Sequence, residues 1–333
     1  MMPWAKGSGI SGMLNNYDRH RLALLDPYHS VVKCFECGEE GIYTGIKNVS
    51  SIPNTLMHRL EKTGFVLHTI DKKSTLAGRA VDTDLINPIT GHYMSGSSSG
   101  TALNVFAGIN ELGIGNDGGG SVLAPAMCVN IYGFISRLIE KDREQVLKEN
   151  TDGMKSGNSI GFMARDREIL FKAIRDSIGI EAAEDYGIVC SDREYEGIES
   201  RIITPEDAFA PRAELTEYLK QILQECDVFI VREGPVDLCG FGDSLFGHFD
   251  ERTKQIQKES GKGYVRVCNT AEATALAIPS VELGCATLLI CESKEDKTAR
   301  LLKAAEYMED VHDELTERYF LDIGSYFMDG YEV

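Results

Sequence analysis

Segments in which apolar residues recur at helical spacing alternate along the chain with short apolar runs that are typical of buried strands. The helical spacing predicts helices over Asn54–Lys62, Thr101–Ile109, Asp166–Ile178, Ala213–Cys226 and Lys294–Tyr319. The apolar runs predict strands over Gly64–Thr69, Val129–Ile135, Asp227–Val231 and Ala286–Cys291. Because helices and strands alternate, the sequence predicts an α/β fold whose central sheet is covered by helices on both faces.

The chain contains no internal repeat and no low-complexity linker, and its nine prolines mark no break between two halves. A length of 333 residues suits one large domain or two ordinary ones. Since no boundary divides the pattern of helices and strands, we predict a single domain over residues 1–333.

Acidic residues outnumber basic ones, with 52 Asp and Glu against 34 Lys and Arg, which gives a formal net charge of −18. Such a surface repels phosphate backbones, so we expect no nucleic-acid partner. No run approaches the roughly 20 apolar residues that span a bilayer, and residues 1–20 hold no apolar core of a secretory signal. We therefore expect no membrane partner and a cytoplasmic location.

Nine cysteines with irregular spacing, several of them in apolar runs, argue against a framework of disulfides. Cys34 and Cys37 in KCFECGEEG have the spacing of half a zinc site. The sequence offers no second C-x-x-C or H-x-H pair to complete such a site. We therefore expect no metal, and the role of this cysteine pair stays open.

The segment 87–135 is rich in glycine and serine, and it matches three motifs. In the first, Gly113, Gly115 and Gly118 form the pattern G-x-G-x-x-G, which can bind the pyrophosphate of a dinucleotide. That site needs a helix opening on the glycines. The proline in the following SVLAPA disfavours a helix there, so we expect a loop and no dinucleotide cofactor.

The second motif is G-x-S-x-G around Ser98, the pattern of a nucleophile elbow. An elbow follows a β-strand, whereas GHYMS is neither apolar nor alternating. It also needs an acid and then a histidine later in the chain, and His248 and His312 are the histidines available. Neither lies in a glycine-framed loop, so this pattern is a weak candidate.

The third interpretation combines two clusters. GSSSG is followed by a helix of small and apolar residues and then by GNDGGGSVLAPA. This arrangement closely resembles the core of the amidase-signature family, which pairs a GGSSGG-like turn with a G-T-D-x-G-G-S-x-R-x-P-A-like loop. The resemblance places the two key serines of the family at Ser97 and Ser121. It implies a single domain with a mixed central sheet, with the catalytic core at about 41–175 and the rest of the sheet and helices at about 176–320.

The family's chemistry also needs a lysine, and two places compete for it. Lys47 in GIYTGIKNVSSIPN resembles the family's G-[IV]-P-x-x-[IV]-K-D-N element. A lysine at the end of an apolar strand suits a buried amine, because burial disfavours the ammonium form. Lys72 and Lys73 lie nearer the serine turn, but their segment resembles the part of the family that follows the lysine. Lys47 is therefore the preferred base, and Lys72 or Lys73 the alternative.

The resemblance implies a role for each of these residues. Ser121 attacks a carboxamide carbon and forms an acyl-enzyme, while Ser97, which follows a cis peptide bond at Gly96–Ser97 in this family, relays the proton to Lys47. The backbone N–H groups of the glycines before Ser121, together with its own, hold the oxyanion. These glycines are Gly118, Gly119 and Gly120. Ser98 and Asp117 orient the lysine and the loop. The mechanism uses no cofactor and no metal.

The likeness covers most of Gly41–Glu309 and is weak outside the serine loops. Where the family has Asp after the lysine, Thr in the nucleophile loop, an arginine after the nucleophile and Pro or Thr in a late strand, this chain has Asn48, Asn116, no arginine and Glu233. We expect hydrolysis of a small amide. The alternatives are a component of an amidotransferase and a catalytically weak binding protein. The sequence does not identify the substrate, and it leaves a homodimer open.

Overall fold

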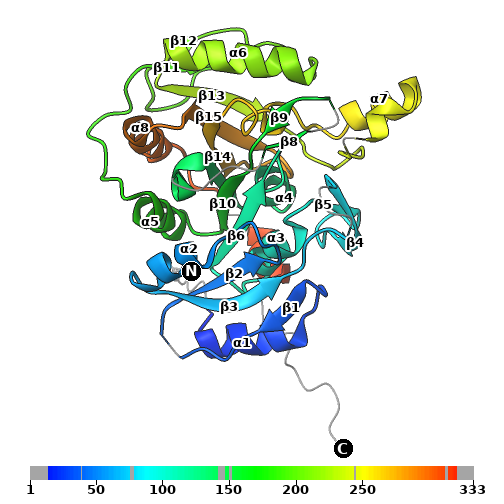
Figure 1. The fold of residues 1–333 in the computed structure, drawn as a ribbon, viewed down its shortest axis with the longest axis vertical. Helices are drawn as coiled ribbons and strands as arrows, with labels where there is room; N and C mark the ends of the chain where they lie inside the picture. Colours follow the sequence, from blue (N-terminus) through cyan, green and yellow to red (C-terminus); the bar gives the residue numbers. More distant parts are fainter. Residues whose placement is uncertain are drawn as a thin grey trace, which may run out of the picture.

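The computed structural model describes residues 14–38, 40–75, 79–141, 147–149, 152–243, 245–311 and 314–320. Its centre is an 11-stranded sheet with the order β1-β3-β2-β6-β10-β7-β14-β15-β13-β11-β12, which runs from the bottom to the top of Figure 1. The strands of this sheet are β1 Val31–Cys34, β2 Ile42–Lys47, β3 Phe65–Asp71, β6 Leu112–Asp117, β7 Tyr132–Ser136, β10 Ser159–Ala164, β11 Val189–Ser191, β12 Arg201–Ile202, β13 Val228–Glu233, β14 Ala273–Pro279 and β15 Ala286–Glu292.

Neighbouring strands pair in both directions. β2 is parallel to β3 and β6, and β11 is parallel to β12 and β13. The remaining pairs of the large sheet are antiparallel. Two small sheets lie beside it, formed by β4 Val81–Ile86 with β5 Tyr93–Ser95 and by β8 Lys148–Glu149 with β9 Lys155–Ser156. The mixed sheet expected from the sequence is confirmed.

Helices cover both faces of the sheet. The described helices are α1 Asn16–Leu25, α2 Asn54–Glu61, α3 Ser99–Phe106, α4 Leu123–Cys128, α5 Arg167–Ile178, α6 Arg212–Glu225, α7 Glu251–Lys258, α8 Glu295–Ala305 and α9 Glu314–Phe320, with short 3₁₀ turns at Arg137–Glu140, Phe246–His248 and Tyr264–Arg266. None of them is both long enough and apolar enough to cross a bilayer.

Successive residues of a strand point to opposite faces of its sheet, and the two large apolar clusters follow this alternation. In β13, Phe229 packs with the cluster that contains α3, α4 and α6. Its neighbour Ile230 packs with the cluster that contains α2, α5 and α8. The predicted three-layer arrangement therefore follows from the side-chain alternation of the strands.

The C-terminal part of the chain differs from the sequence prediction. Lys294–Tyr319 is not one long helix, because α8 ends at Ala305 and α9 starts at Glu314. The chain leaves the helix to make tertiary contacts. Arg167 donates a hydrogen bond to the carbonyl of Met308, and the Tyr132 hydroxyl donates one to Asp310. Residues 312–313 lie outside the described residues.

Two expectations about the glycine- and serine-rich segment are also wrong. Leu123–Cys128 is a helix despite Pro125, because the first turn of a helix needs no intrahelical N–H partner. The strand predicted from Val129 starts only at Tyr132 for the same reason. The GHYMS stretch does contain a short strand, β5, although it pairs with β4 and not with the large sheet.

The strand glycines of G-x-G-x-x-G allow α3 to lie directly on β6. A Cβ added at Gly113 would be 2.6 Å from Thr101 Cγ2, and one at Gly115 would be 2.8 Å from Ser98 Oγ. Both glycines are therefore explained by close packing between helix and strand. This packing holds the start of α3, which follows the serine turn, against the strand that leads to Ser121.

Candidate active site

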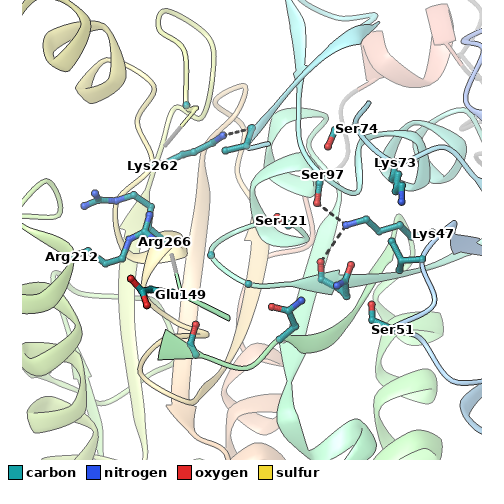
Figure 2. A pocket seen from close by; sticks show the side chains of 18 of the residues that line it. Lys47, Ser51, Lys73, Ser74, Ser97, Ser121, Glu149, Arg212, Lys262 and Arg266 are labelled. Carbon is teal, nitrogen blue, oxygen red and sulfur yellow. Dashed lines mark hydrogen bonds between the residues drawn. The ribbon is translucent and has the colours of Figure 1, made fainter. Parts of the chain in front are cut away.

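Lys47 is the last residue of β2, between β3 and β6. Its side chain is 3% exposed. The Nζ atom donates a hydrogen bond of 2.7 Å to Ser97 Oγ and a longer one of 3.5 Å to the carbonyl of Asn116. Figure 2 shows both interactions as dashed lines. The strand thus delivers a buried amine to the serine turn.

Burial lowers the pKa of Lys47 to about 7, because the ammonium form loses its solvation. The charge of Asp117 raises this pKa, and the charge of Lys73 lowers it. A substantial fraction of the amine is therefore neutral at neutral pH, which is the form that accepts a proton.

Ser97 follows β5 and is 7% exposed. The Gly96–Ser97 peptide bond is cis, the geometry that the resemblance implies. The backbone on both sides of this bond is anchored: the N–H of Gly96 donates to the carbonyl of Ala80, and the N–H of Ser74 donates to the carbonyl of Ser97. The hydroxyl that meets Lys47 is thus held by neighbouring loops.

The loop that carries Ser121 leaves β6 at Asp117. The buried carboxylate of Asp117 accepts hydrogen bonds of 2.7 Å from the N–H of Gly120 and from the N–H of Val122. Gly120 has φ +101, a conformation that strongly favours glycine. Asp117 therefore fixes the shape of the turn around Ser121. Burial raises the pKa of Asp117, whereas these N–H groups lower it.

Two supporting residues behave differently from the expectation. The N–H of Gly120 already donates to Asp117, so it is removed from the expected oxyanion donors. Gly118, Gly119 and Ser121 line the catalytic cavity, whereas Gly120 is not among its lining residues. Ser98 does not bond Lys47, because its buried hydroxyl has no hydrogen-bond partner among the described residues. Its backbone N–H instead donates to the carbonyl of Ser121 at 3.1 Å.

Lys47, Ser97 and Ser121 all line one cavity of about 490 Å³. In the view of Figure 2, Ser121 lies between the Lys47 and Ser97 side and a group of basic residues. The basic side chains of the cavity other than Lys47 are Lys73, Arg212, Lys262 and Arg266, against the single carboxylate of Glu149 among the described lining residues. A basic cavity in a protein of net charge −18 is a local feature that sequence composition does not predict.

Arg212, from the first turn of α6, and Arg266 lie close to the nucleophile loop. A Cβ at Gly119 would be 3.8 Å from Arg212 Nη1 and 3.6 Å from the carbonyl of Arg266. Arg212 pairs with Asp152 at 3.0 Å, and Arg266 donates to the carbonyls of Ala208 and Ala210. These arginines occupy the neighbourhood of the loop in which the sequence lacks the expected arginine.

Glu233, a departure from the family pattern, has a structural role near these arginines. Its buried carboxylate accepts hydrogen bonds from the N–H groups of Gly263, Tyr264 and Val265. Burial raises the pKa of Glu233 to about 7, and these N–H groups and the charge of Arg266 oppose the shift. The side chain therefore holds the turn that presents Arg266 to the cavity.

The alternative catalytic residues have other surroundings. Lys72 pairs with Asp84 at 3.4 Å. Lys73 lines the cavity, but the described hydrogen bond to Ser97 comes from Lys47. His248 Nε2 lies 3.9 Å from Asp152, and His312 lies outside the described residues. The geometry thus favours the Ser97–Lys47 pair over an elbow with a histidine.

The profile of the amidase family matches residues 73–236. No curated protein matches the sequence. Among solved structures, the A-type component of glutamyl-tRNA(Gln) amidotransferase from Thermotoga maritima is 14% identical, with a TM-score of 0.60 over 87% of this chain and 91% of that one. A 6-aminohexanoate cyclic dimer hydrolase complexed with substrate is 12% identical, with a TM-score of 0.60 over 89% and 94% of the two chains. At these identities the structures show a shared fold.

Proposed function

Because this chain belongs to the amidase family, we propose that it hydrolyses the carbon–nitrogen bond of a carboxamide with Ser121 as nucleophile, Ser97 as proton relay and Lys47 as base. The observation that carries the proposal is the 2.7 Å contact between Lys47 Nζ and Ser97 Oγ, in a cavity that Ser121 also lines. A serine hydroxyl becomes an effective nucleophile when a base removes its proton, and a neutral lysine provides that base without a histidine.

In the proposed cycle, Ser121 Oγ bonds to the amide carbon while its proton passes to Ser97 Oγ and the Ser97 proton passes to Lys47 Nζ. The relay then returns a proton to the leaving nitrogen as the carbon–nitrogen bond breaks. Water attacks the resulting ester, with its proton taken up through the same relay, and releases the acid and free Ser121. Every proton taken from a nucleophile is thus returned to a leaving group.

The N–H groups of Gly118, Gly119 and Ser121 are the proposed donors to the oxyanion, since these residues line the cavity. Donors of this kind each lower the barrier by about 3 kcal/mol. Asp117 contributes indirectly, because it fixes the turn through the N–H groups of Gly120 and Val122.

The charges of the cavity favour an amide that also carries a carboxylate. After burial, the charge of Arg212 is the largest cause that lowers the pKa of Arg266, which indicates that the two guanidinium groups repel each other. A substrate carboxylate beside both groups would relieve that repulsion and form charge-assisted hydrogen bonds. We therefore place the carboxylate end of the substrate at Arg212 and Arg266 and the amide at Ser121.

A fluorophosphonate probe tests the nucleophile. We expect labelling of the wild type and loss of labelling in Ser121→Ala, whereas Ser98→Ala keeps it. Both variants are compared with the wild type by circular dichroism to establish that they fold. Labelling that disappears only in Ser98→Ala contradicts the proposal and supports an elbow centred on Ser98.

Ammonia release from a panel of primary amides tests the activity itself. We expect turnover that is absent in Ser121→Ala and faster for amides that carry a carboxylate. A folded wild type that neither reacts with the probe nor releases ammonia at any pH would instead favour a binding protein without catalysis. Release only after a partner protein is added would favour an amidotransferase component.

A further inference from the structure

A second cluster of reactive side chains lies where α1 packs beside β1 and β3, at the lower edge of the sheet in Figure 1. His20 comes from α1, Cys34 ends β1 and His68 lies in β3. Cys34 Sγ is 3.4 Å from His20 Nδ1 and 3.5 Å from His68 Nε2. One ligand atom from each residue lies within 4.8 Å of the others. None of the three lines the catalytic cavity.

These separations are those of neighbouring ligands around one ion. With Zn–S near 2.3 Å and Zn–N near 2.0–2.1 Å, two ligands of a tetrahedral zinc ion lie roughly 3.5–3.6 Å apart. The two observed S···N distances are close to this value. A pair of thiol–imidazole contacts converging on one sulfur is therefore already arranged as a zinc site requires.

The hydrogen bonds behind His68 orient it as a ligand. Its Nδ1 lies 2.9 Å from Asn110 Oδ1, and Asn110 Nδ2 donates to Thr69 Oγ1 at 2.7 Å. This network assigns the amide oxygen to the histidine side, so Nδ1 carries the hydrogen and Nε2 presents its lone pair towards Cys34. Metal-binding histidines commonly donate their second N–H to an oxygen in this manner.

Cys37 supplies a fourth donor from the same C-x-x-C sequence. Its Sγ lies 3.2 Å from the carbonyl of Leu67, the residue before His68. It is half-buried, as is Cys34. The tertiary structure thus brings two histidines to the cysteine pair, although the sequence shows no second pair beside it in the chain.

We propose that His20, Cys34, Cys37 and His68 bind one structural Zn²⁺ ion. Two thiolates and two imidazoles form a donor set that suits tetrahedral zinc. All four positions are filled by protein, so the ion does not activate water. Its effect is to fasten α1 and the edge strand β1 to β3, because the ligands come from these elements and from the turn after β1.

Metal analysis of the full-length protein tests this site. After incubation with ZnCl₂ and gel filtration in metal-free buffer, we expect about one zinc per chain. Cys34→Ser and His20→Gln should each lose most of it, whereas Cys239→Ser, which changes an exposed thiol, should keep it. Zinc below about a tenth of an equivalent in the wild type, or retained in both ligand variants, would overturn the proposal.

Cobalt substitution gives a readout that does not depend on activity or folding yield. Co²⁺ in the wild type should show thiolate-to-cobalt charge-transfer absorption, which decreases by about half in Cys37→Ser and disappears in the double variant with Cys34→Ser. Absorption that is unchanged in Cys37→Ser would exclude it as a ligand. Fluorophosphonate labelling of Ser121 should persist in the zinc-free protein, so failure of the zinc site and failure of the amidase proposal are distinguishable.

Discussion

Lys47 Nζ and Ser97 Oγ lie 2.7 Å apart, and the lysine is 3% exposed. One residue ends a strand of the central sheet and the other follows a cis peptide bond in a separate loop. Because burial lowers the pKa of the amine to about 7, this pair couples the ionisation of Lys47 to the reactivity of Ser121.

The rate of acylation should therefore depend on pH through Lys47. The neutral amine is the active form, so kcat/KM should rise as pH increases through about 7 and become constant above it. One unit below this pKa the rate should be roughly a tenth of the plateau. Initial rates of ammonia release from pH 5 to 9 measure the profile. A rate that falls as pH increases over this range would contradict a lysine base.

Replacement of Lys47 with methionine should separate stability from activity. The unfolded chain keeps this amine protonated up to about pH 10.5, whereas the folded form releases the proton above about pH 7. The wild type's free energy of unfolding should thus rise with pH between these values. Lys47→Met lacks this penalty, so it should be more stable at pH 7, on the order of a few kcal/mol, with kcat/KM lower by about 10²–10⁴. Urea unfolding at pH 7 and pH 10 measures the difference, which should shrink at the higher pH.

Ser97→Ala and Ser98→Ala form a matched pair of neighbouring serines. Ser97 accepts the hydrogen bond of Lys47, whereas the hydroxyl of Ser98 has no partner among the described residues. We expect Ser97→Ala to lower kcat by about 10²–10⁴ with little change in KM. Ser98→Ala should stay within about tenfold of the wild type. Equal losses in the two variants would show that Ser97 has no special role in proton transfer.

Asp117→Asn should weaken the nucleophile loop. Both carboxylate oxygens of Asp117 accept backbone N–H groups, and an amide replaces one acceptor by a donor that faces an N–H. We expect a loss of about 1–3 kcal/mol in the free energy of unfolding and a lower kcat. Thermal unfolding and steady-state kinetics measure the two effects. An Asp117→Asn enzyme with wild-type stability and kcat would remove this residue from the account of the loop.

Arg212→Ala should change the preference among substrates. Removal of one guanidinium from the basic side of the cavity should raise KM about 10- to 100-fold for an amide that carries a carboxylate. The KM of a neutral amide of similar size should stay nearly constant. Lys254→Ala, which changes an exposed lysine on α7, is the control. Equal changes for charged and neutral amides would exclude Arg212 as the contact for the carboxylate.

Much of the candidate site could be predicted from the sequence because it depends on local patterns. The GSSSG turn, the GNDGGGS loop and the lone lysine after GIYTGI are short segments, and each acts through its own backbone geometry. The pattern of apolar residues likewise predicted α5 within one residue and the starts of α2 and β15, since strong periodicity and helix caps are local signals.

The tertiary structure decided which distant groups meet. Arg212 and Arg266 reach the cavity from segments far from Ser121 in the chain, and the break between α8 and α9 depends on contacts of residues 307–310 with other elements. The proton of Gly120 is taken by Asp117, a detail set by the folded turn. By itself the sequence determined the chemical groups and the local turns, whereas the charge around the substrate and the histidines beside Cys34 depend on packing between elements, because such contacts leave no periodic pattern along the chain.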